Sequence, residues 1–386
     1  MEKAIYTRPP LEILACTNAE CEWYGKQNQG NLHVRKIYGR DQIRYLRCSV
    51  CKSEFSERKG TALWNCKIDE ERAIAVAEHL GEGCSFKSTA RLVRVDPDTV
   101  RRLNRVLGQH SQLFHDERAQ ELVVYNLQAD ERHGFVTNKR TPSWEAEIID
   151  PASKLVLSHV QGEKNMGMIR NLLEDAASRL SHRHQVALFT DGEPAYAALF
   201  PEVFGVPYRR YRDSHRGRPP EIHYRIPRTL AHVQIIKKQS KRRLQSVTVK
   251  YRHGSKKRAQ EALYALRHTV PNTSIIERRN GTARGMNASQ TRRTLAFSRH
   301  PTAKLALGWW TLTVYNWCRT HRMLQEPLRR STFSKKYVHR TPAMALGLAQ
   351  NVLSAAEILR TPVYPLRPGE ARNQICFSCR QYSGTI

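Results

Sequence analysis

Apolar residues recur at helical spacing between positions 69 and 109, where the pattern predicts three consecutive helices. The first helix has one apolar stripe, formed by Ile68, Ala75, Val76 and Leu80. A short second helix is predicted over 85–93. The third begins after a turn, with Asp96 as its N-cap and Pro97 in its first position. This order over 66–118 is typical of a helix-turn-helix domain whose last helix enters a major groove; a plain three-helix bundle is the alternative.

A different pattern over 122–211 predicts a sheet with covering helices. Strands are expected at 123–130 with a continuation at 134–136, at 144–150, at 154–160, at 186–189 and near Tyr208, and helices at 166–180 and 194–204. A meander of three strands, a crossover helix and a returning strand is the order of a ribonuclease-H-like sheet. Because the crossover makes the returning strand parallel to the first, Asp130 and Asp191 should lie side by side at the centre of the sheet.

Three carboxylates on separate elements suggest a metal site, because Mg²⁺ prefers hard oxygen ligands. Asp130 and Asp191 each end a strand, and the third candidate is Glu277, the only acidic residue in the interval 262–325. The alternative for Glu277 is a capping box, in which Ser274 caps a helix and Glu277 reaches back to the amide of the cap.

Each of the two aspartates has an acidic neighbour. Glu131 follows Asp130, and Glu193 lies two residues after Asp191. Side chains alternate between the two faces of a strand, so Glu131 should point away from the face that carries Asp130. Both glutamates are therefore weaker candidates for metal ligands.

The charge of the chain indicates a polyanionic partner. Its 386 residues include 64 Lys and Arg against 35 Asp and Glu, for a formal charge of +29 and a pI near 10.1. A hydrophobic content of 40% fits a globular protein of two or three domains. The N-terminus has no signal-peptide pattern, and the longest apolar run falls short of the ~20 residues that span a bilayer, so we expect a soluble cytoplasmic protein.

Cysteines at short spacings predict a zinc ribbon over 11–60. The two pairs are Cys16, Cys21, Cys48 and Cys51. Four thiolates in two tight knuckles give Zn²⁺ a closed tetrahedral shell, which is structural rather than catalytic. A last pair, Cys376 and Cys379, lies in the C-terminal region 326–386 without a second pair to complete a site.

The most basic tract of the chain lies between 209 and 258 and predicts a hairpin, with strands at 233–236 and 247–250. Such a tract either binds DNA or is a solvated surface. The candidate DNA-binding residues, from this tract, from the third predicted helix and from the helix after Ser274, are Arg101, Arg102, Arg105, Lys237, Lys238, Lys241, Arg242, Arg243, Arg278 and Arg279. In that last helix Gly281 and Gly285 each cost about 1 kcal/mol relative to alanine, and the close approach of another backbone or of nucleic acid would justify them.

These features together resemble DDE-type insertion-sequence transposases that join a zinc ribbon and a helix-turn-helix to a ribonuclease-H-like catalytic domain. The matching segments, besides the cysteine pairs, are Ala129-Asp130-Glu131-Arg132-His133-Gly134-Phe135-Val136, Phe189-Thr190-Asp191-Gly192, Asn272-Thr273-Ser274-Ile275-Ile276-Glu277-Arg278-Arg279-Asn280 and Leu295-Ala296-Phe297-Ser298. A late segment, Tyr315-Asn316 with Arg319-Thr320-His321-Arg322, is similar to a tail motif of such enzymes, although Thr320 stands where proline is usual.

The resemblance implies a multidomain α+β protein whose catalytic domain covers 121–325, with a basic hairpin inserted at about 212–270. It implies that Asp130, Asp191 and Glu277 are a catalytic triad holding two Mg²⁺ ions, which stabilise the attacking and leaving oxygens of an in-line displacement at phosphorus. The implied activity is cleavage and strand transfer at transposon ends. The implied partners are double-stranded DNA and further copies of the chain, as a homodimer or higher oligomer at the bacterial nucleoid. A catalytically inactive DNA-binding regulator and a nuclease without joining activity remain the alternatives.

Overall fold

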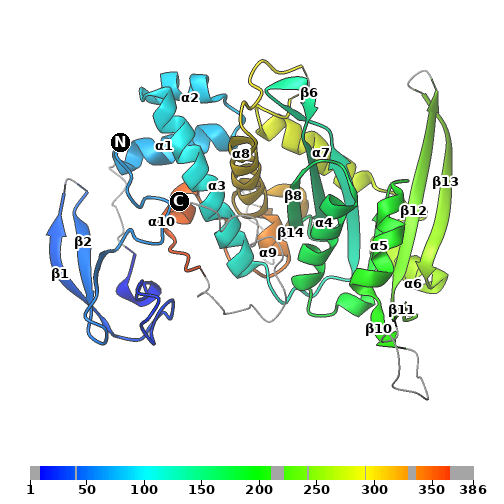
Figure 1. The fold of residues 1–386 in the computed structure, drawn as a ribbon, viewed down its shortest axis with the longest axis horizontal. Coiled ribbons are helices and arrows are strands. Elements are labelled where there is room, and N and C mark those ends of the chain that lie inside the picture. Colours follow the sequence, from blue (N-terminus) through cyan, green and yellow to red (C-terminus); the bar gives the residue numbers. More distant parts are fainter. Residues whose placement is uncertain are drawn as a thin grey trace.

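The computed structural model describes residues 9–39, 41–209, 221–240, 243–291, 293–328 and 336–365. After a short 3₁₀ turn (Leu11–Ile13), the N-terminal region is an antiparallel sheet of three strands, β1 (Leu32–Tyr38), β2 (Ile43–Cys48) and β3 (Glu54–Ser56), at the left of Figure 1. Its buried cluster is small and includes the sulfur-bearing side chains of three of the paired cysteines. A region with so little apolar core needs a further stabilising element, such as a structural metal.

Three helices follow, as predicted: α1 (Glu70–Gly81), α2 (Phe86–Val93) and α3 (Pro97–Arg118). Each begins at a side chain that accepts a backbone N–H, namely Asp69, Ser85 and Asp96. The turn between α2 and α3 begins at Arg94, whose φ of 59° is in the left-handed region. The third helix is longer than its apolar pattern predicted.

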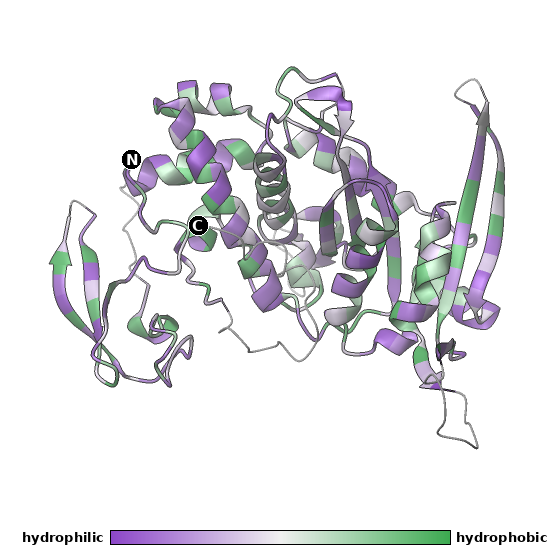
Figure 2. Ribbon diagram, viewed as in Figure 1, coloured by the Kyte–Doolittle hydropathy of each residue, from purple (hydrophilic) through white to green (hydrophobic). Residues whose placement is uncertain are grey.

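The close crossing of α3 with α8 (Pro301–Thr313) joins the three-helix region to the rest of the molecule. A Cβ atom on Gly108 would lie 2.2 Å from the Cα of Ala306, so only glycine permits this approach. Asn104 Nδ2 donates to the carbonyl of Ala303 over 3.0 Å. Figure 2 shows α8 as a largely hydrophobic helix in the middle of the molecule, which fits its burial.

The C-terminal half of α3 packs on the next region. His115 Nε2 donates to the Leu157 carbonyl over 2.8 Å, and the ring of Phe114 meets Trp317 edge-on at 5.2 Å between centroids. Helix α3 therefore carries Arg101 and Arg105 in its first half, while its second half is held against the large sheet.

The large sheet has six strands in the order β13-β12-β9-β4-β7-β8. Its strands are β4 (Asn126–Arg132), β7 (Trp144–Ile149), β8 (Val156–Gly162), β9 (Ala187–Thr190), β12 (Ala231–Ser240) and β13 (Arg243–Gly254). The first three form the predicted antiparallel meander, and β9 returns parallel to β4 after α4 (Met166–Ser178). This mixed sheet is consistent with a ribonuclease-H-like fold. The segment predicted to continue β4 instead forms a separate hairpin, β5 (Phe135–Val136) with β6 (Asn138–Pro142).

Helices cover both faces of the sheet. On one face lie α4 and α5 (Pro194–Phe204), and on the other lie α6 (Lys256–Ala265), α7 (Ser274–Met286) and α8 (Figure 1). No helix among the described residues combines the length and apolarity that crossing a bilayer requires.

The predicted basic hairpin is present, but it is not a separate insertion. Its strands β12 and β13 pair over ten residue pairs, and β12 also pairs in parallel with β9, from Ala231 opposite Ala187 to Gln234 opposite Thr190. The hairpin is thus the edge of the large sheet, extended beyond the end of β9. A smaller hairpin, β10 (Val206–Arg209) with β11 (Ile222–Arg225), lies beside α5.

The last described residues contact both helix α1 and the cysteine-containing N-terminal region. After β14 (His321–Pro327), β15 (Tyr337–Arg340) and α9 (Pro342–Ala345), helix α10 (Ala355–Arg360) lies against α1. Arg360 pairs with Glu70 at 2.6 Å, and the hydroxyl of Tyr364 accepts from the backbone of Ala15 at 2.8 Å. Cys376 and Cys379 lie outside the described residues.

Candidate active site and metal centres

Strand pairing brings two of the predicted acids together. Ala129 of β4 is paired with Thr190 of β9, so Asp130 and Asp191, the next residues, lie side by side at the centre of the sheet. Together with Glu131 they form a group in which one carboxylate oxygen from each residue lies within 4.8 Å of the other two. This group is called the carboxylate cluster below.

Asp130 is held in place by α7. Its Oδ2 accepts from Nδ2 of Asn280 at 2.7 Å, and Oδ1 accepts from the backbone of Glu131 at 2.9 Å. Arg132 in turn donates to Oδ1 of Asn280 at 2.8 Å, which fixes the orientation of the amide. Asp191 accepts from the backbone N–H of Glu193 at 3.0 Å. Both carboxylates are thus oriented before any ligand binds.

Alternation along β4 turns Glu131 towards α5, as expected, yet its carboxylate remains in the cluster. Tyr196 donates to Glu131 at 2.5 Å, and the ammonium of Lys164 lies 2.9 Å from it and 3.0 Å from Glu193. The Glu131 side chain is 1% exposed. Residues at the end of a strand can approach one another from both faces, which the alternation rule does not consider.

The third predicted acid, Glu277, is in the first turn of α7 and outside the carboxylate cluster. It accepts from the hydroxyl of Thr273 at 2.6 Å and pairs with Lys237 of β12. The backbone N–H of Ser274 bonds instead to Asn272, so the capping-box alternative is excluded.

The cluster is built to attract a cation. Burial, followed by the charges of Asp191, Glu131 and Glu277, raises the pKa of Asp130 to about 7. Burial also raises the pKa of Glu131, against the hydrogen bonds from Tyr196 and Lys164. Crowded carboxylate oxygens are the hard donors that Mg²⁺ prefers, and a divalent ion would remove their mutual repulsion. The donor set therefore fits a divalent metal.

We expect metal affinity at this cluster to depend on pH. Binding requires ionised Asp130, so Mg²⁺ affinity should fall about tenfold per pH unit below about 7 and level off above it. Because the pKa of Asp130 is raised in the folded state, the folded protein holds this proton more tightly than the unfolded chain does. The resulting stability of the metal-free fold is fully present below about pH 4 and is lost as the pH rises through 7. Calorimetric Mg²⁺ titrations between about pH 5.5 and 8, with Asp130→Asn as control, measure the dependence. A pH-independent affinity in the wild type would contradict it.

A buried ion network lies beneath the cluster. Arg132 contacts Glu145 at 3.1 Å and Glu147 at 2.7 Å, Arg279 contacts Glu147 at 3.0 Å, and Lys304 contacts Glu145 at 2.5 Å. All five side chains are at most 4% exposed. Although burial opposes ionisation, Lys304 and Arg132 outweigh it and lower the pKa of Glu145 to about 2. The network therefore stays charged over the physiological range.

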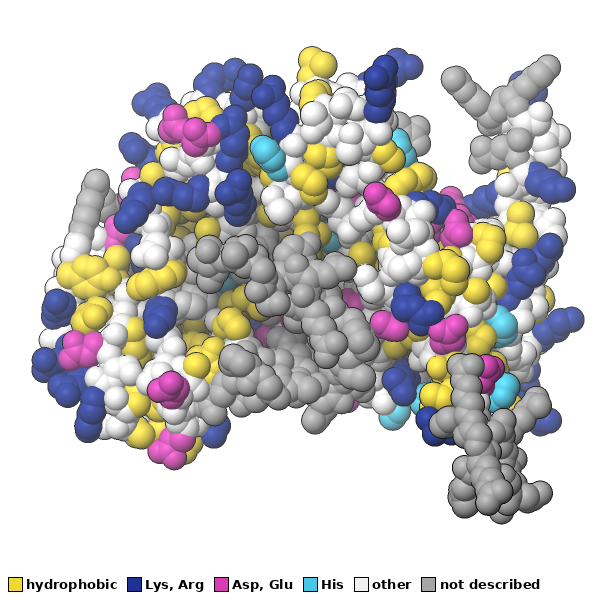
Figure 3. All heavy atoms as spheres, viewed as in Figure 1, with side chains coloured by type: hydrophobic (Ala, Val, Ile, Leu, Met, Phe, Trp, Pro, Cys, Tyr) yellow, Lys and Arg dark blue, Asp and Glu magenta, His cyan; other side chains and the backbone are white. Residues whose placement is uncertain are grey.

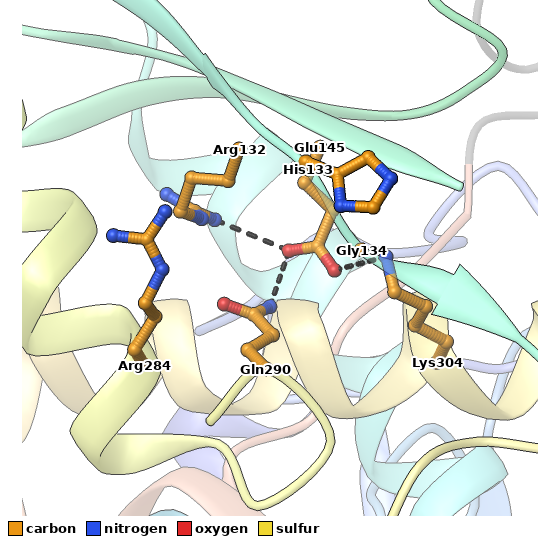
Figure 4. Close-up of a pocket in the computed structure, with 7 residues that line it drawn as sticks. All are labelled: Arg132, His133, Gly134, Glu145, Arg284, Gln290 and Lys304. Atoms are coloured by element: carbon orange, nitrogen blue, oxygen red, sulfur yellow. Dashed lines mark hydrogen bonds and ion pairs between the residues drawn. The ribbon is translucent and has the colours of Figure 1, made fainter. Parts of the chain in front are cut away.

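Figure 4 shows how the network opens to a small pocket. The Glu145 carboxylate lies between Arg132, Gln290 and Lys304, and Arg284 lines the same pocket. Arg132, which lines this pocket, also donates to Asn280, and Asn280 donates to Asp130. The pocket is therefore linked to Asp130 through these two side chains.

Arg279, which the sequence predicts as a DNA contact, is buried in the structure. Its guanidinium is 1% exposed, pairs with Glu147 and lies over the ring of Tyr315 at 4.2 Å. The spacing of Ile276, Ala283 and Met286 along α7 places Arg279 on the buried stripe, a signal present in the sequence.

The other candidate DNA contacts are largely exposed. Figure 3 shows lysines and arginines over α1 to α3 and along the hairpin. The exposed members are Arg101, Arg102, Arg105, Lys237, Lys238, Arg243 and Arg278, and of these Arg101 and Lys237 each pair with an acidic side chain. Lys241 and Arg242 lie outside the described residues. A Cβ on Gly281 or Gly285 would meet open space, so steric contact at these positions does not require glycine.

The four predicted zinc ligands meet in one group. Their sulfur atoms lie within 4.8 Å of one another, with 3.5 Å between Cys16 and Cys51 and 4.0 Å between Cys21 and Cys48. Four sulfurs bound to Zn²⁺ at about 2.3 Å are roughly 3.8 Å apart, so the spacing fits. Burial opposes ionisation of Cys51, yet hydrogen bonds with the side chain and backbone of Ser53 prevail and lower its pKa to about 6.

We expect Cys48→Ser to lose zinc and to unfold the N-terminal sheet, because structural zinc contributes folding free energy directly. Elemental analysis should give one zinc per wild-type chain and none in the variant, with faster proteolysis before residue 60. Cys84→Ser, which changes a cysteine outside the group, is the control. Full zinc content in Cys48→Ser would contradict the assignment.

Comparisons with known proteins give slight likenesses. No family model matches the chain, and no curated protein does. Among solved structures, the Mos1 strand transfer complex matches with 10% identity over 33% of this chain and a TM-score of 0.16. A pre-cleavage Mos1 transpososome matches with 8% identity over 64% of this chain and 78% of that chain, with a TM-score of 0.20. The chain spans about half, 52%, of the length of the first. The function must therefore be argued from the chain's own residues.

Proposed function

We propose that the chain is a DDE-type DNA transposase, which cuts DNA at the ends of a mobile element and joins those ends to target DNA. The observation that carries the proposal is the carboxylate cluster at the ends of two adjacent central strands. Its crowded, pre-oriented oxygens suit metal-dependent phosphoryl transfer better than a purely structural role, in which such repulsion would be a cost.

In this proposal Asp130 and Asp191 hold the metal, and Glu277 is the third ligand. A divalent ion would supply Lewis-acid stabilisation of the charge that develops on the phosphoryl oxygens. Asn280 and the N–H of Glu193 contribute by fixing the two aspartates, so no reorganisation is needed when DNA arrives.

The reaction has two phosphoryl transfers. In cleavage, water adds to phosphorus, the P–O3′ bond breaks, and the departing oxygen takes up a proton as a free 3′-hydroxyl. In joining, that hydroxyl loses its proton, attacks a target phosphate and displaces the target's own 3′-oxygen. One phosphodiester bond forms as another breaks, so joining needs no external energy source.

The exposed basic residues would hold the DNA. The N-terminal half of α3 presents Arg101, Arg102 and Arg105 from a helix-turn-helix, where they could reach base edges. The hairpin presents Lys238, Arg243 and others along an edge that begins beside the carboxylate cluster.

The decisive experiment uses labelled duplexes that carry the DNA ends flanking the gene, an unlabelled plasmid and Mg²⁺. The expected products are a nicked or cut end and a labelled joint with the plasmid. Cleavage without a joint would favour a nuclease. Specific binding without cleavage would favour a regulator.

Salt dependence of DNA binding tests the hairpin. Removing one cation that neutralises a phosphate should reduce the slope of log affinity against log salt by roughly 0.9 for duplex DNA. We therefore expect Lys238→Ala with Arg243→Ala to flatten the slope by about 2, equally for terminal and random sequence. Arg101→Ala with Arg105→Ala should reduce the preference for terminal sequence. An unchanged slope in the hairpin variant would show that these side chains contact only solvent or protein.

A further inference from the structure

A hydrogen bond and an ion pair hold the Glu277 carboxylate outside the carboxylate cluster. Its carboxylate is held by Thr273 and by Lys237, whose ammonium also lies 3.4 Å from the Thr273 hydroxyl. Asn280, three residues later in α7, reaches Asp130 at 2.7 Å. Residues three apart on a helix share a face, with Cβ atoms ~5–6 Å apart, so Glu277 starts within reach of the cluster it does not join.

Lys237 belongs to the part of β12 that extends past the rest of the sheet. Pairing with β9 ends at Gln234 opposite Thr190, directly before Asp191. Lys237 follows three residues later, opposite Val247 of β13, and its neighbour Lys238 is exposed. Any DNA lying along this hairpin on its way to the cluster passes Lys237.

The contact between Lys237 and Glu277 is open to competition. The two side chains are 32% and 46% exposed, and ion pairs at such positions are weak. A DNA phosphate is a strong acceptor for a lysine ammonium. Arg278, which is exposed beside Glu277, adds a second cation for the same phosphate backbone.

We propose that Lys237 is a positioning residue that keeps Glu277 outside the carboxylate cluster in the free protein and releases it when a DNA phosphate takes its ammonium. The third ligand then joins Asp130 and Asp191 only when DNA is present. This couples metal binding to DNA binding. The inference rests on the proposed function, because it assumes that the cluster binds metal and the hairpin binds DNA.

The test is Mn²⁺ binding to the full-length, zinc-loaded protein, followed by the electron paramagnetic resonance signal of free Mn²⁺. Without DNA, Lys237→Gln should bind Mn²⁺ about two- to fivefold more tightly than wild type, the range that removal of a half-exposed ion pair gives. A duplex of arbitrary sequence, corrected for the Mn²⁺ that the DNA binds alone, should tighten binding to wild type by a similar factor and leave Lys237→Gln unchanged. Lys237→Arg, which keeps the charge, should behave as wild type.

Two controls separate this role from a general effect of charge. Lys257→Gln removes an exposed cation from α6 without touching Glu277, so Mn²⁺ affinity should not change. In a Glu277→Gln background, Lys237→Gln should have no effect, because the residue that it releases is gone. A gain that persists in that background, or no gain in Lys237→Gln itself, overturns the inference.

Failure of the proposed function would look different. If Asp130→Asn binds Mn²⁺ as tightly as wild type, the cluster is not a metal site and the function fails with it. If Asp130→Asn loses the ion while Lys237→Gln is indistinguishable from wild type, only the role of Lys237 is refuted.

Discussion

Asp130→Asn and Asp191→Asn should each reduce DNA cleavage and joining by about a thousandfold or more, equivalent to ~4 kcal/mol of transition-state stabilisation. Each replacement removes one anionic metal ligand from the carboxylate cluster. The amide keeps an oxygen for the hydrogen bond from Asn280 or from the Glu193 backbone, so the local structure should survive. The measurement is the rate of joint formation on labelled ends at saturating Mg²⁺.

The matched control is Glu163→Gln, which neutralises an exposed acid close to the same edge of the sheet. It should retain full activity, and all three variants should bind DNA at least as tightly as wild type, because a negative charge has been removed from a chain of formal charge +29. Activity in Asp191→Asn equal to that of Glu163→Gln would remove Asp191 from the catalytic site.

Glu147→Gln should destabilise the fold by about 3–5 kcal/mol, the usual result of removing one partner from a buried ion network. Glu147 faces Arg132, Arg279 and His159, and its side chain is 1% exposed. The neutral amide leaves two buried guanidinium groups with too little negative charge. Urea unfolding of the zinc-loaded protein, followed by tryptophan fluorescence, measures the effect through the buried Trp310 and Trp317.

Glu202→Gln is the comparison for this prediction. It breaks the ion pair with Arg170 at 2.6 Å, whose side chains are 38% and 39% exposed. The cost should be at most about 1 kcal/mol, since solvent screens such pairs. Equal effects of the two substitutions would mean that the network beneath the cluster is held by packing rather than by charge.

The order of four of the six strands, β9-β4-β7-β8, and the meeting of two aspartates could be predicted from the sequence because both follow from local periodicity and one rule for crossover connections. The apolar run before Asp130 and the run before Asp191 each specify a strand. A crossover helix between them leaves only a parallel arrangement. The four cysteines likewise met as their spacing predicted.

Contacts made across the fold could not be predicted in this way. The pairing of Glu277 with Lys237 depends on how far β12 extends past β9, and no local pattern records that length. The same holds for the hairpin, which the sequence predicts as an insertion but which is continuous with the large sheet. Arg279 is a different case. The spacing of apolar residues in α7 indicates which face is buried, but Arg278 and Arg279 are adjacent and of the same residue type, so the sequence makes them look equivalent.

Because α3 is one unbroken helix, it fixes the distance between the arginines near its start and the large sheet at its far end. This helix has 22 residues and is about 33 Å long. The exposed arginines lie near its start, and its far end is fixed to the sheet through His115. A terminal sequence read at one end would therefore lie at a constant distance and rotational phase from the carboxylates. An added base pair shifts a phosphate by ~3.4 Å and turns it by about a tenth of a helical turn. The protein would thus cut at a fixed number of base pairs from the sequence that it recognises. Cleavage would fail when base pairs are added to or removed from that interval.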